Sequence, residues 1–480
     1  MTALRSASIA LFCTMALIGC SDEIAPTAPA TPEETLANLS AGDARLNMSL
    51  TEPVSKHLFV FKGRAPGDFE ARVEELGGTV TLNHAIGIAV ARGLDSEDAA
   101  GLESVVGAQF VEEAPEFQLI EPAALGQPTA LMQASASPSS VEDPSSAILF
   151  ANQWNMRQIH ADEAWAAGHL GSADVTVAIL DTGIDYMLPD LAGLVDLERS
   201  VSFEPNDDLF TELFFPGRHP STDLHFHGTN VATQVASNAW AFAGVTSKTT
   251  LMSVKVCSVL GGCHGVIEGI LYAIDNGADV INMSLGGWFS KAAYPGAVSA
   301  YNSIMNYARQ QGVTIVVAAG NDANNLNTQK NIAIKDAAGN IIDRVHVPSF
   351  FATYCDARAV ICVSATRDND IPAGYTNYGR SAIDVAAPGG GGGDWVYALC
   401  PQTSLVFNCA GGYYPLGVAG TSQATPHVSG LAALMVAKYG RNPSKIKNAI
   451  KNSADDLGQS GNDPYFGSGR INVAAALGLN

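Results

Sequence analysis

The sequence predicts an α/β protein whose main domain is built on a doubly wound, mostly parallel sheet, preceded by a small α+β domain. After about residue 152, short apolar segments alternate with helical stretches, which is typical of a parallel sheet covered by helices. Before that point the segments follow the order β-α-β-β-α-β, the ferredoxin-like pattern. The 480 residues, 47% of them hydrophobic, are enough for two to four folding units at roughly 100–200 residues each.

The first 20 residues predict an export signal that is not part of the fold. Arg5 is the only charged residue among them, and an apolar run over 6–19 follows it. This run is shorter than the roughly 20 residues that a membrane helix needs, but it suits the core of a signal peptide. The run ends in Leu17-Ile18-Gly19-Cys20, which resembles the bacterial lipobox and implies a lipid on Cys20. An ordinary signal peptide with a chance cysteine is the alternative.

Residues 21–53 are rich in Ala, Pro, Thr and Glu without periodicity, and we expect a disordered tether there. The small domain is predicted over 54–121, where Gly77-Gly78 suits the end of a helix. We expect strands over 57–62, 79–82, 86–91 and 110–113, and helices over 68–76 and from 95 or 96 to about 106. Residues 122–148 have the Ala, Pro, Ser and Gln content of a linker.

The main domain is predicted over 149–480. Buried strands are expected over 175–180, 250–256, 280–283 and 314–318, and helices over 266–275 and 293–311. In an open sheet of this kind, the functional residues lie beyond the carboxyl ends of the strands.

Four segments carry residues suited to catalysis. Asp181 follows the first buried strand, and Asn321 follows the strand over 314–318. His227 stands before Gly228-Thr229, which suits a helix start, and Ser422 stands at the start of a helix that runs through Leu431 and Met435.

A chemical role follows for each of the four. A serine hydroxyl is a poor nucleophile until a base such as His227 removes its proton. Asp181 would hold the imidazole in one tautomer. The helix start at Ser422 and the amide of Asn321 would stabilise an oxyanion.

In this order the four segments resemble the subtilisin-like serine peptidases, in which Asp, His and Ser follow one another along the chain. The resemblance covers about 153–480 and implies a serine endopeptidase with Asp181, His227 and Ser422 as its triad and Asn321 in its oxyanion hole. It implies that Ser284-Leu285-Gly286 pairs with the substrate backbone. It also implies that Ala319-Gly320 forms the opposite wall of the pocket for the residue before the scissile bond.

The resemblance has consequences for the small domain and for cofactors. Residues 54–121 are similar to the family's inhibitory prodomain, so the chain would be a zymogen that inhibits and processes itself. The chemistry needs no cofactor. Gln153 and Asp190 match two ligands of a calcium site found in many relatives, so a structural calcium ion stays open. Gln423 departs from the family, which usually has Met after the nucleophile.

Six further cysteines fall in three close pairs. Local disulfides are expected because each loop is short, and such bridges persist only outside the reducing cytosol. A zinc site is the alternative, although no Cys-x-x-Cys accompanies these residues. The pairs are Cys257 with Cys263, Cys355 with Cys362, and Cys400 with Cys409.

Composition limits the partners. Only 15% of the residues are charged, and the net charge is −21. This balance gives no basic face for nucleic acid and no attraction to anionic lipid. We therefore expect a monomer that acts on polypeptides, meets its own prodomain as an inhibitor, and contacts a membrane only through a lipid anchor before processing.

The leading hypothesis is an exported serine endopeptidase. Its precursor would be a lipoprotein of the bacterial cell envelope, and the mature enzyme would be extracellular or periplasmic. The alternative is a catalytically silent surface lipoprotein that binds peptides.

Overall fold

The small domain forms the four-stranded antiparallel sheet that its pattern predicts. In the computed structural model, the described residues run from 55 to 479, except 116, 121, 132–139, 328–330, 336–340, 347–349, 353 and 358. The sheet has the order β2-β3-β1-β4. Its elements are β1 (Lys56–Val60), α3 (Phe69–Glu75), β2 (Thr79–His84), β3 (Ile88–Arg92), α4 (Ser96–Val106) and β4 (Phe110–Glu113).

Local signals explain the limits of helix α4. The Asp95 side chain accepts hydrogen bonds from the backbone N–H groups of Glu97 and Asp98, which caps the start of the helix. Gly107 ends it with a φ of 70°, the left-handed conformation that favours glycine. The predicted order of elements in this domain is confirmed, with boundaries that shift by a few residues.

The main domain contains a seven-stranded sheet in which every pairing is parallel, and this confirms the predicted fold class. Its strand order is β19-β18-β14-β11-β7-β9-β8. The strands are β7 (Thr176–Asp181), β8 (Val201–Ser202), β9 (Thr250–Lys255), β11 (Val280–Met283), β14 (Thr314–Ala318), β18 (Val360–Thr366) and β19 (Val385–Pro388).

Helices cover both faces of this sheet, so alternate residues of each strand enter different cores. Val177 and Ile179 of β7 pack into one core, whereas Ala178 and Leu180 pack into the other. The first core includes residues of α5 (Trp154–Gln158), α6 (Ala161–Ala166), α8 (His227–Val235), α11 (Thr421–Tyr439), α12 (Pro443–Asn452) and α13 (Val473–Leu477). The second includes residues of α9 (Val266–Asp275) and α10 (Pro295–Gln310).

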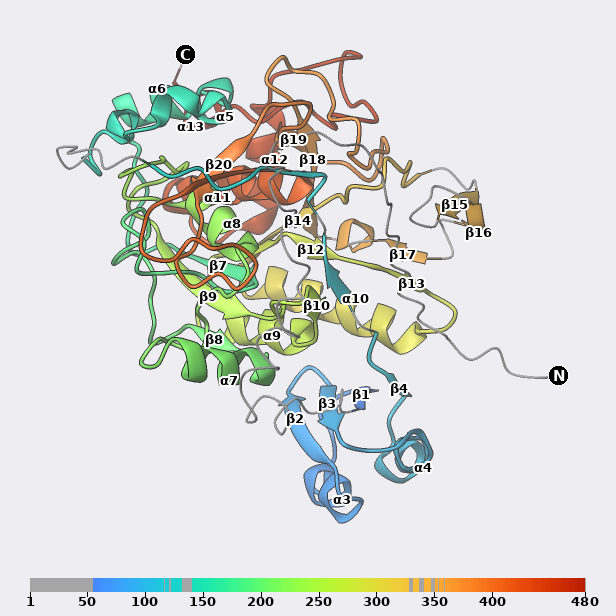
Figure 1. The fold of residues 1–480 in the computed structure, drawn as a ribbon. Coiled ribbons are helices and arrows are strands. Elements are labelled where there is room, and N and C mark those ends of the chain that lie inside the picture. The colour runs from blue at the N-terminus through green and yellow to red at the C-terminus, as the bar shows by residue number, and fades with distance from the viewer. Residues whose placement is uncertain are drawn as a thin grey trace, which may run out of the picture.

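Figure 1 shows the small domain, in blue, beside α9 and α10 of the main domain. The remaining elements are short and lie around the main sheet. They are α7 (Pro205–Phe214), β10 (Gly262–Cys263), β12 (Leu285–Gly286), β13 (Trp288–Ser290), β15 (Asn331–Lys335), β16 (Ile341–His346), β17 (Phe350–Ala352), β20 (Val396–Leu399), β21 (Pro415–Ala419) and the 3-10 turns Pro144–Ser146, Phe150–Asn152 and Tyr354–Asp356.

The segment that leaves the small domain runs across the main domain. Strand β5 (Phe117–Leu119) lies between β10 and β12, and β6 (Ala124–Leu125) pairs with β21. Beyond β6, the N–H groups of Thr129 and Leu131 donate to Pro415 and Tyr413. The first part of the linker expected over 122–148 is therefore hydrogen-bonded to the main domain, through β6 and the residues that follow it.

The three predicted disulfides are confirmed, and the zinc alternative is wrong for these cysteines. The bridges join Cys257 to Cys263, Cys355 to Cys362 and Cys400 to Cys409. The expected signal peptide, the lipid on Cys20 and the tether fall outside the described residues. Within the part of the chain that the structure describes, no helix is both long enough and apolar enough to cross a membrane.

Candidate active site

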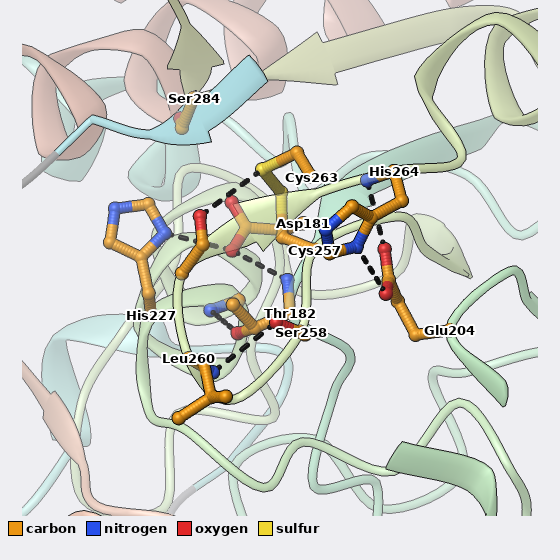
Figure 2. The surroundings of a disulfide bond; sticks show 12 residues. Asp181, Thr182, Glu204, His227, Cys257, Ser258, Leu260, Cys263, His264 and Ser284 are labelled. Carbon is orange, nitrogen blue, oxygen red and sulfur yellow. Dashed lines mark hydrogen bonds and ion pairs between the residues drawn. A yellow bond between two sulfur atoms is a disulfide. The ribbon is translucent and has the colours of Figure 1, made fainter. Parts of the chain in front are cut away.

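Asp181 and His227 form a buried pair at the carboxyl end of β7. Asp181 is the last residue of β7, and His227 is the first residue of α8. His227 Nδ1 lies 2.8 Å from Asp181 Oδ1, and both side chains are fully buried (Figure 2). The carboxylate can therefore hold the ring in the tautomer that leaves Nε2 as a proton acceptor.

Two glycines allow this pair to form. A Cβ atom on Gly228 would lie 2.1 Å from the Gly183 carbonyl oxygen, so α8 can approach the turn after β7 only without a side chain there. Gly183 has a φ of 106°, and its own Cβ would lie 2.5 Å from the Ser221 carbonyl oxygen. The Asp-Thr-Gly and His-Gly-Thr segments thus bring the two backbones together.

A second buried carboxylate, Asp223, supports this arrangement. Its oxygens accept hydrogen bonds from Thr182 Oγ1 at 2.9 Å, from Thr229 Oγ1 at 2.6 Å, and from the backbone N–H groups of Thr229 and His225 at 2.9 Å. Thr182 Oγ1 in turn accepts from the Gly228 N–H. Burial raises the pKa of Asp223 to about 6, although the hydrogen bonds from these donors act to lower it.

Asp223 fixes the residues beside both members of the pair, and sequence reasoning missed it. The available signal was the spacing of Asp223, which stands four positions before His227 and six positions before Thr229. An aspartate at this spacing can accept hydrogen bonds from the first turn of a helix. An isolated Asp at such a position is equally typical of an ordinary turn.

Ser422 lies in the first turn of α11 and is fully buried. Its hydroxyl donates to the Ser284 carbonyl oxygen at 3.2 Å, and Ser284 Oγ donates back to the Ser422 carbonyl oxygen at 2.9 Å. Gln423 Nε2 donates to Asn230 Oδ1 on α8 at 3.3 Å. The starts of α8 and α11 are therefore tied together beside β12, which carries Leu285 and Gly286.

Asn321 follows β14 and turns its amide toward the start of α11. Its Oδ1 accepts hydrogen bonds from the Thr421 N–H and from Thr421 Oγ1, both at 2.9 Å. Its Nδ2 then lies beside Gly420, where a Cβ atom would approach it to 3.1 Å. Thr421 is a second residue that the sequence did not single out.

Ala319 and Gly320, the residues predicted to line one wall of the substrate pocket, lie between the end of β14 and Asn321. The Asn377 side chain donates to the Ala319 carbonyl oxygen at 2.8 Å, and the Asn377 N–H donates to that of Gly320 at 2.9 Å. The Gly320 N–H donates to Thr421 Oγ1 at 3.1 Å. The strand end that carries these two residues is thus fixed to the helix that carries Ser422.

The two calcium candidates come from different segments and contact one loop, Ala241–Ala243, whose N–H groups already bond their oxygen atoms. Gln153 Oε1 accepts from the Ala243 N–H at 2.7 Å, and Asp190 Oδ1 accepts from the Ala241 N–H at 2.7 Å. Burial raises the pKa of Asp190 to about 7. Among the described residues no group of three His, Cys, Asp or Glu could hold a metal. Backbone N–H groups stand where a cation would need to be, so these residues do not fit a calcium ion.

Comparison with known proteins places this site in a family. The sequence model of the Subtilase family matches residues 172–469. Thermitase from Thermoactinomyces vulgaris is 33% identical over 336 residues, which cover 70% of this chain and 99% of thermitase. Subtilisin E from Bacillus subtilis strain 168 is 31% identical over 328 residues, covering 67% of this chain and 70% of the relative.

Solved structures share the fold at lower identity. The epidermin leader peptide processing serine protease from Staphylococcus aureus has a TM-score of 0.67 at 21% identity, covering 89% of this chain and 99% of that chain. Fervidolysin from Fervidobacterium pennivorans has a TM-score of 0.62 at 23% identity, covering 90% of this chain and 62% of that chain.

Proposed function

Because the chain belongs to the subtilase family and is a serine endopeptidase, we propose that it is exported as a self-inhibited zymogen that cuts its own backbone between Ile120 and Glu121. Ser422 Oγ would bond to the carbonyl carbon before the scissile bond while His227 accepts its proton. Collapse of the intermediate breaks the C–N bond and passes that proton to the leaving amine. Water then releases the acyl group by the same steps.

Asp181 would stabilise the imidazolium that forms on His227. The Asn321 amide and the N–H groups at the start of α11 would stabilise the oxyanion. This chemistry needs no cofactor, and polypeptides are the substrates.

The observation that carries the proposal is the pairing of the chain's own strand β5 with β12, the strand next to Ser284 and Ser422. Strand β5 is paired with β10 on one side and with β12 on the other. Leu119 lies opposite Leu285 in the antiparallel ladder, so the next residue, Ile120, comes opposite Ser284. Ser284 is the residue that exchanges two hydrogen bonds with Ser422.

The chain is anchored again just after this point. The Ala123 N–H donates to the Ala419 carbonyl oxygen at 2.7 Å, three residues before Ser422. The bond that meets the nucleophile therefore lies between Leu119 and Ala123. The register favours the bond after Ile120, whose side chain is 9% exposed.

Contacts between the two domains support an inhibitory role for the small domain. The Glu112 carboxylate accepts hydrogen bonds from the Gly296 and Ala297 N–H groups at the start of α10, where a negative charge is favoured. Lys56 Nζ lies 2.7 Å from the buried carboxylate of Glu268 on α9. Docking thus uses specific polar contacts of the kind that hold a cut prodomain in place.

Export rests on two further observations. The first 20 residues, which lie outside the described part of the chain, have the composition of an export signal that ends at Cys20. The three disulfides need an oxidising compartment. A cut after Ile120 would leave the lipid anchor on the prodomain. The mature enzyme would then be released once the prodomain dissociates or is digested.

Substrate preference follows from the surroundings of Phe117. Its ring stacks on Tyr354 at 5.1 Å between centroids and meets Tyr301 and Phe289 edge-on at 5.5 and 5.7 Å. If the cut follows Ile120, Phe117 is the fourth residue before the scissile bond. We expect an aromatic preference at that position.

This preference can be measured with the peptide Phe-Gln-Leu-Ile carrying a chromogenic leaving group. Replacing its Phe by Ala should lower kcat/KM about 100-fold, because the ring loses its burial and its aromatic contacts. Replacing its Gln by Ala is the matched control, since Gln118 is exposed. Equal losses for both replacements would contradict the aromatic subsite.

The proposed cleavage position is tested on the purified wild-type enzyme. N-terminal sequencing should give Glu121-Pro122-Ala123. Ile120→Lys should slow the appearance of this product about 100-fold, because a charge would enter a buried position. Gln118→Lys at the neighbouring exposed residue should not. A mature N-terminus within 132–148, with no cut at Ile120, would contradict the proposal.

A further inference from the structure

The disulfide between Cys257 and Cys263 closes a loop at the edge of the candidate site. The loop begins at Cys257, two residues after the end of β9, where the Cys257 N–H donates to the Asp181 carbonyl oxygen at 3.2 Å. It turns back through hydrogen bonds from the Ser258 N–H to the Gly262 carbonyl oxygen at 2.8 Å and from the Gly261 N–H to the Ser258 carbonyl oxygen at 2.9 Å. Figure 2 shows the bridge beside Asp181.

The returning arm of this loop is the strand that binds β5. The Leu119 N–H donates to the Gly261 carbonyl oxygen at 2.8 Å, and the ladder pairs Gln118 with Gly262 and Phe117 with Cys263. One half of the bridge therefore belongs to the strand itself. Of the three disulfides in the described residues, this is the one whose cysteine lies in a strand paired with β5.

The sequence of the arm explains why it needs a covalent tie. Gly261 has a φ of 86°, and Gly262 follows it. Glycine has the most backbone freedom to lose on ordering. The preceding Leu260 is 52% exposed and provides little packing at the tip. A strand of this composition would not hold an extended shape by itself.

Two carboxylates hold the flanks of the loop but not its glycines. Glu204 accepts hydrogen bonds from the His264 N–H at 3.0 Å and from His264 Nδ1 at 2.8 Å. Asp207 accepts from the Val259 N–H at 3.0 Å. Between these points the two arms are joined by the hydrogen bond from Ser258 to Gly262 and by the disulfide, which is the covalent link between them.

We propose that Cys257 and Cys263 are positioning residues for substrate binding: their disulfide holds Gly261–Cys263 extended before a polypeptide arrives. A preformed edge strand spares the ordering cost that binding would otherwise include. The disulfide then raises kcat/KM for substrates that extend to the fourth residue before the scissile bond. It has little effect on kcat/KM for substrates that have only the first residue before that bond. This inference rests on the proposed function.

A general structural role makes a different prediction, since a bridge that only stabilises the fold affects all substrates alike. The test compares two thiobenzyl esters with the same leaving group, Phe-Gln-Leu-Ile and N-acetyl-Ile, on processed enzyme from the full chain. For the double variant Cys257→Ala/Cys263→Ala, the ratio of kcat/KM for the long ester to that for the short ester should fall at least about tenfold.

The matched control is Cys400→Ala/Cys409→Ala, which removes a bridge outside β10 and should leave the ratio within about twofold of wild type. A ratio within about twofold of wild type for Cys257→Ala/Cys263→Ala would overturn the inference. If the processed wild-type enzyme hydrolyses neither ester, the proposed function is overturned instead.

A second measurement tests the same inference on wild-type enzyme, in case the double variant Cys257→Ala/Cys263→Ala does not fold. Processed wild-type enzyme is reduced in steps with a phosphine, and the exposed thiols are alkylated and mapped at each step. The loss of long-ester preference should follow alkylation of Cys257 and Cys263. A loss that follows Cys400 and Cys409, or full alkylation of Cys257 and Cys263 with an unchanged ratio, would overturn the inference.

Discussion

Ser422→Ala should abolish peptide hydrolysis and leave the chain uncut at Ile120. In subtilisin, a relative of this chain, removal of the nucleophile lowers kcat by a factor of about 10⁶, and we expect the same scale. The structure gives the reason, since Ser422 lies at the start of α11, tied to β12 through Ser284 and to α8 through Gln423. No other described hydroxyl has this position.

The measurement is the mass of the purified protein together with labelling by a fluorophosphonate. Wild type should be processed and labelled, and Ser422→Ala should be neither. The matched control is Ser429→Ala, two turns along the same helix, where the hydroxyl donates to Asn282 Oδ1 at 2.8 Å. Wild type that is folded but unlabelled would favour the alternative of a catalytically silent peptide binder.

The main features of the fold could be predicted because each one depends on local pattern. The helix Val266–Asp275 was predicted at its observed bounds, since Ile267, Leu271 and Ile274 recur at helical spacing on a buried face. The buried strands were recognisable as apolar runs too short for helices. The residues of the candidate site were recognisable because each follows a strand or begins a helix, where backbone geometry fixes the side chain.

The pairing of β5 and β6 with strands of the main domain could not be predicted. Strands β5 and β6 have three and two residues, and segments so short carry no usable alternation. Their structure comes from partners more than a hundred residues away, such as Gly261 and Gly417. The sequence therefore assigned β5 to the small domain and indicated a linker where the chain forms β6, although both strands pair with the main domain.

The calcium expectation shows the limit of matching residues one at a time. Gln153 and Asp190 occupy positions that fit the family's ligands, but the loop around Ala241 and Ala243 supplies N–H donors in place of a cation. A calcium site also depends on the backbone groups that surround its side-chain ligands. Two matching side chains do not show whether those backbone groups are carbonyl oxygens or N–H donors. Strands β15 and β16 likewise form an antiparallel pair that no local signal in the sequence showed.

Asn321→Ala should lower kcat by roughly 10²–10³ while KM changes little, the range measured for the matching donor of subtilisin, a relative. The amide is held by its oxygen, which accepts two hydrogen bonds from Thr421 at 2.9 Å, and this orientation places Nδ2 on the side of Gly420, next to the start of α11. A donor placed for the transition state adds little to ground-state binding. This asymmetry separates a catalytic amide from a structural one, because loss of structure would raise KM as well.

Steady-state kinetics on the Phe-Gln-Leu-Ile substrate measures both constants. Asn324→Ala is the matched control, because Asn324 lies on the same loop and bonds Asn377 and Tyr378 only through its backbone in the described contacts. It should keep kcat within about threefold of wild type, as expected for a surface change away from the chemistry. If Asn321→Ala lowers kcat less than tenfold, the oxyanion donor must be another group, and the N–H groups at the start of α11 would have to stabilise the oxyanion alone.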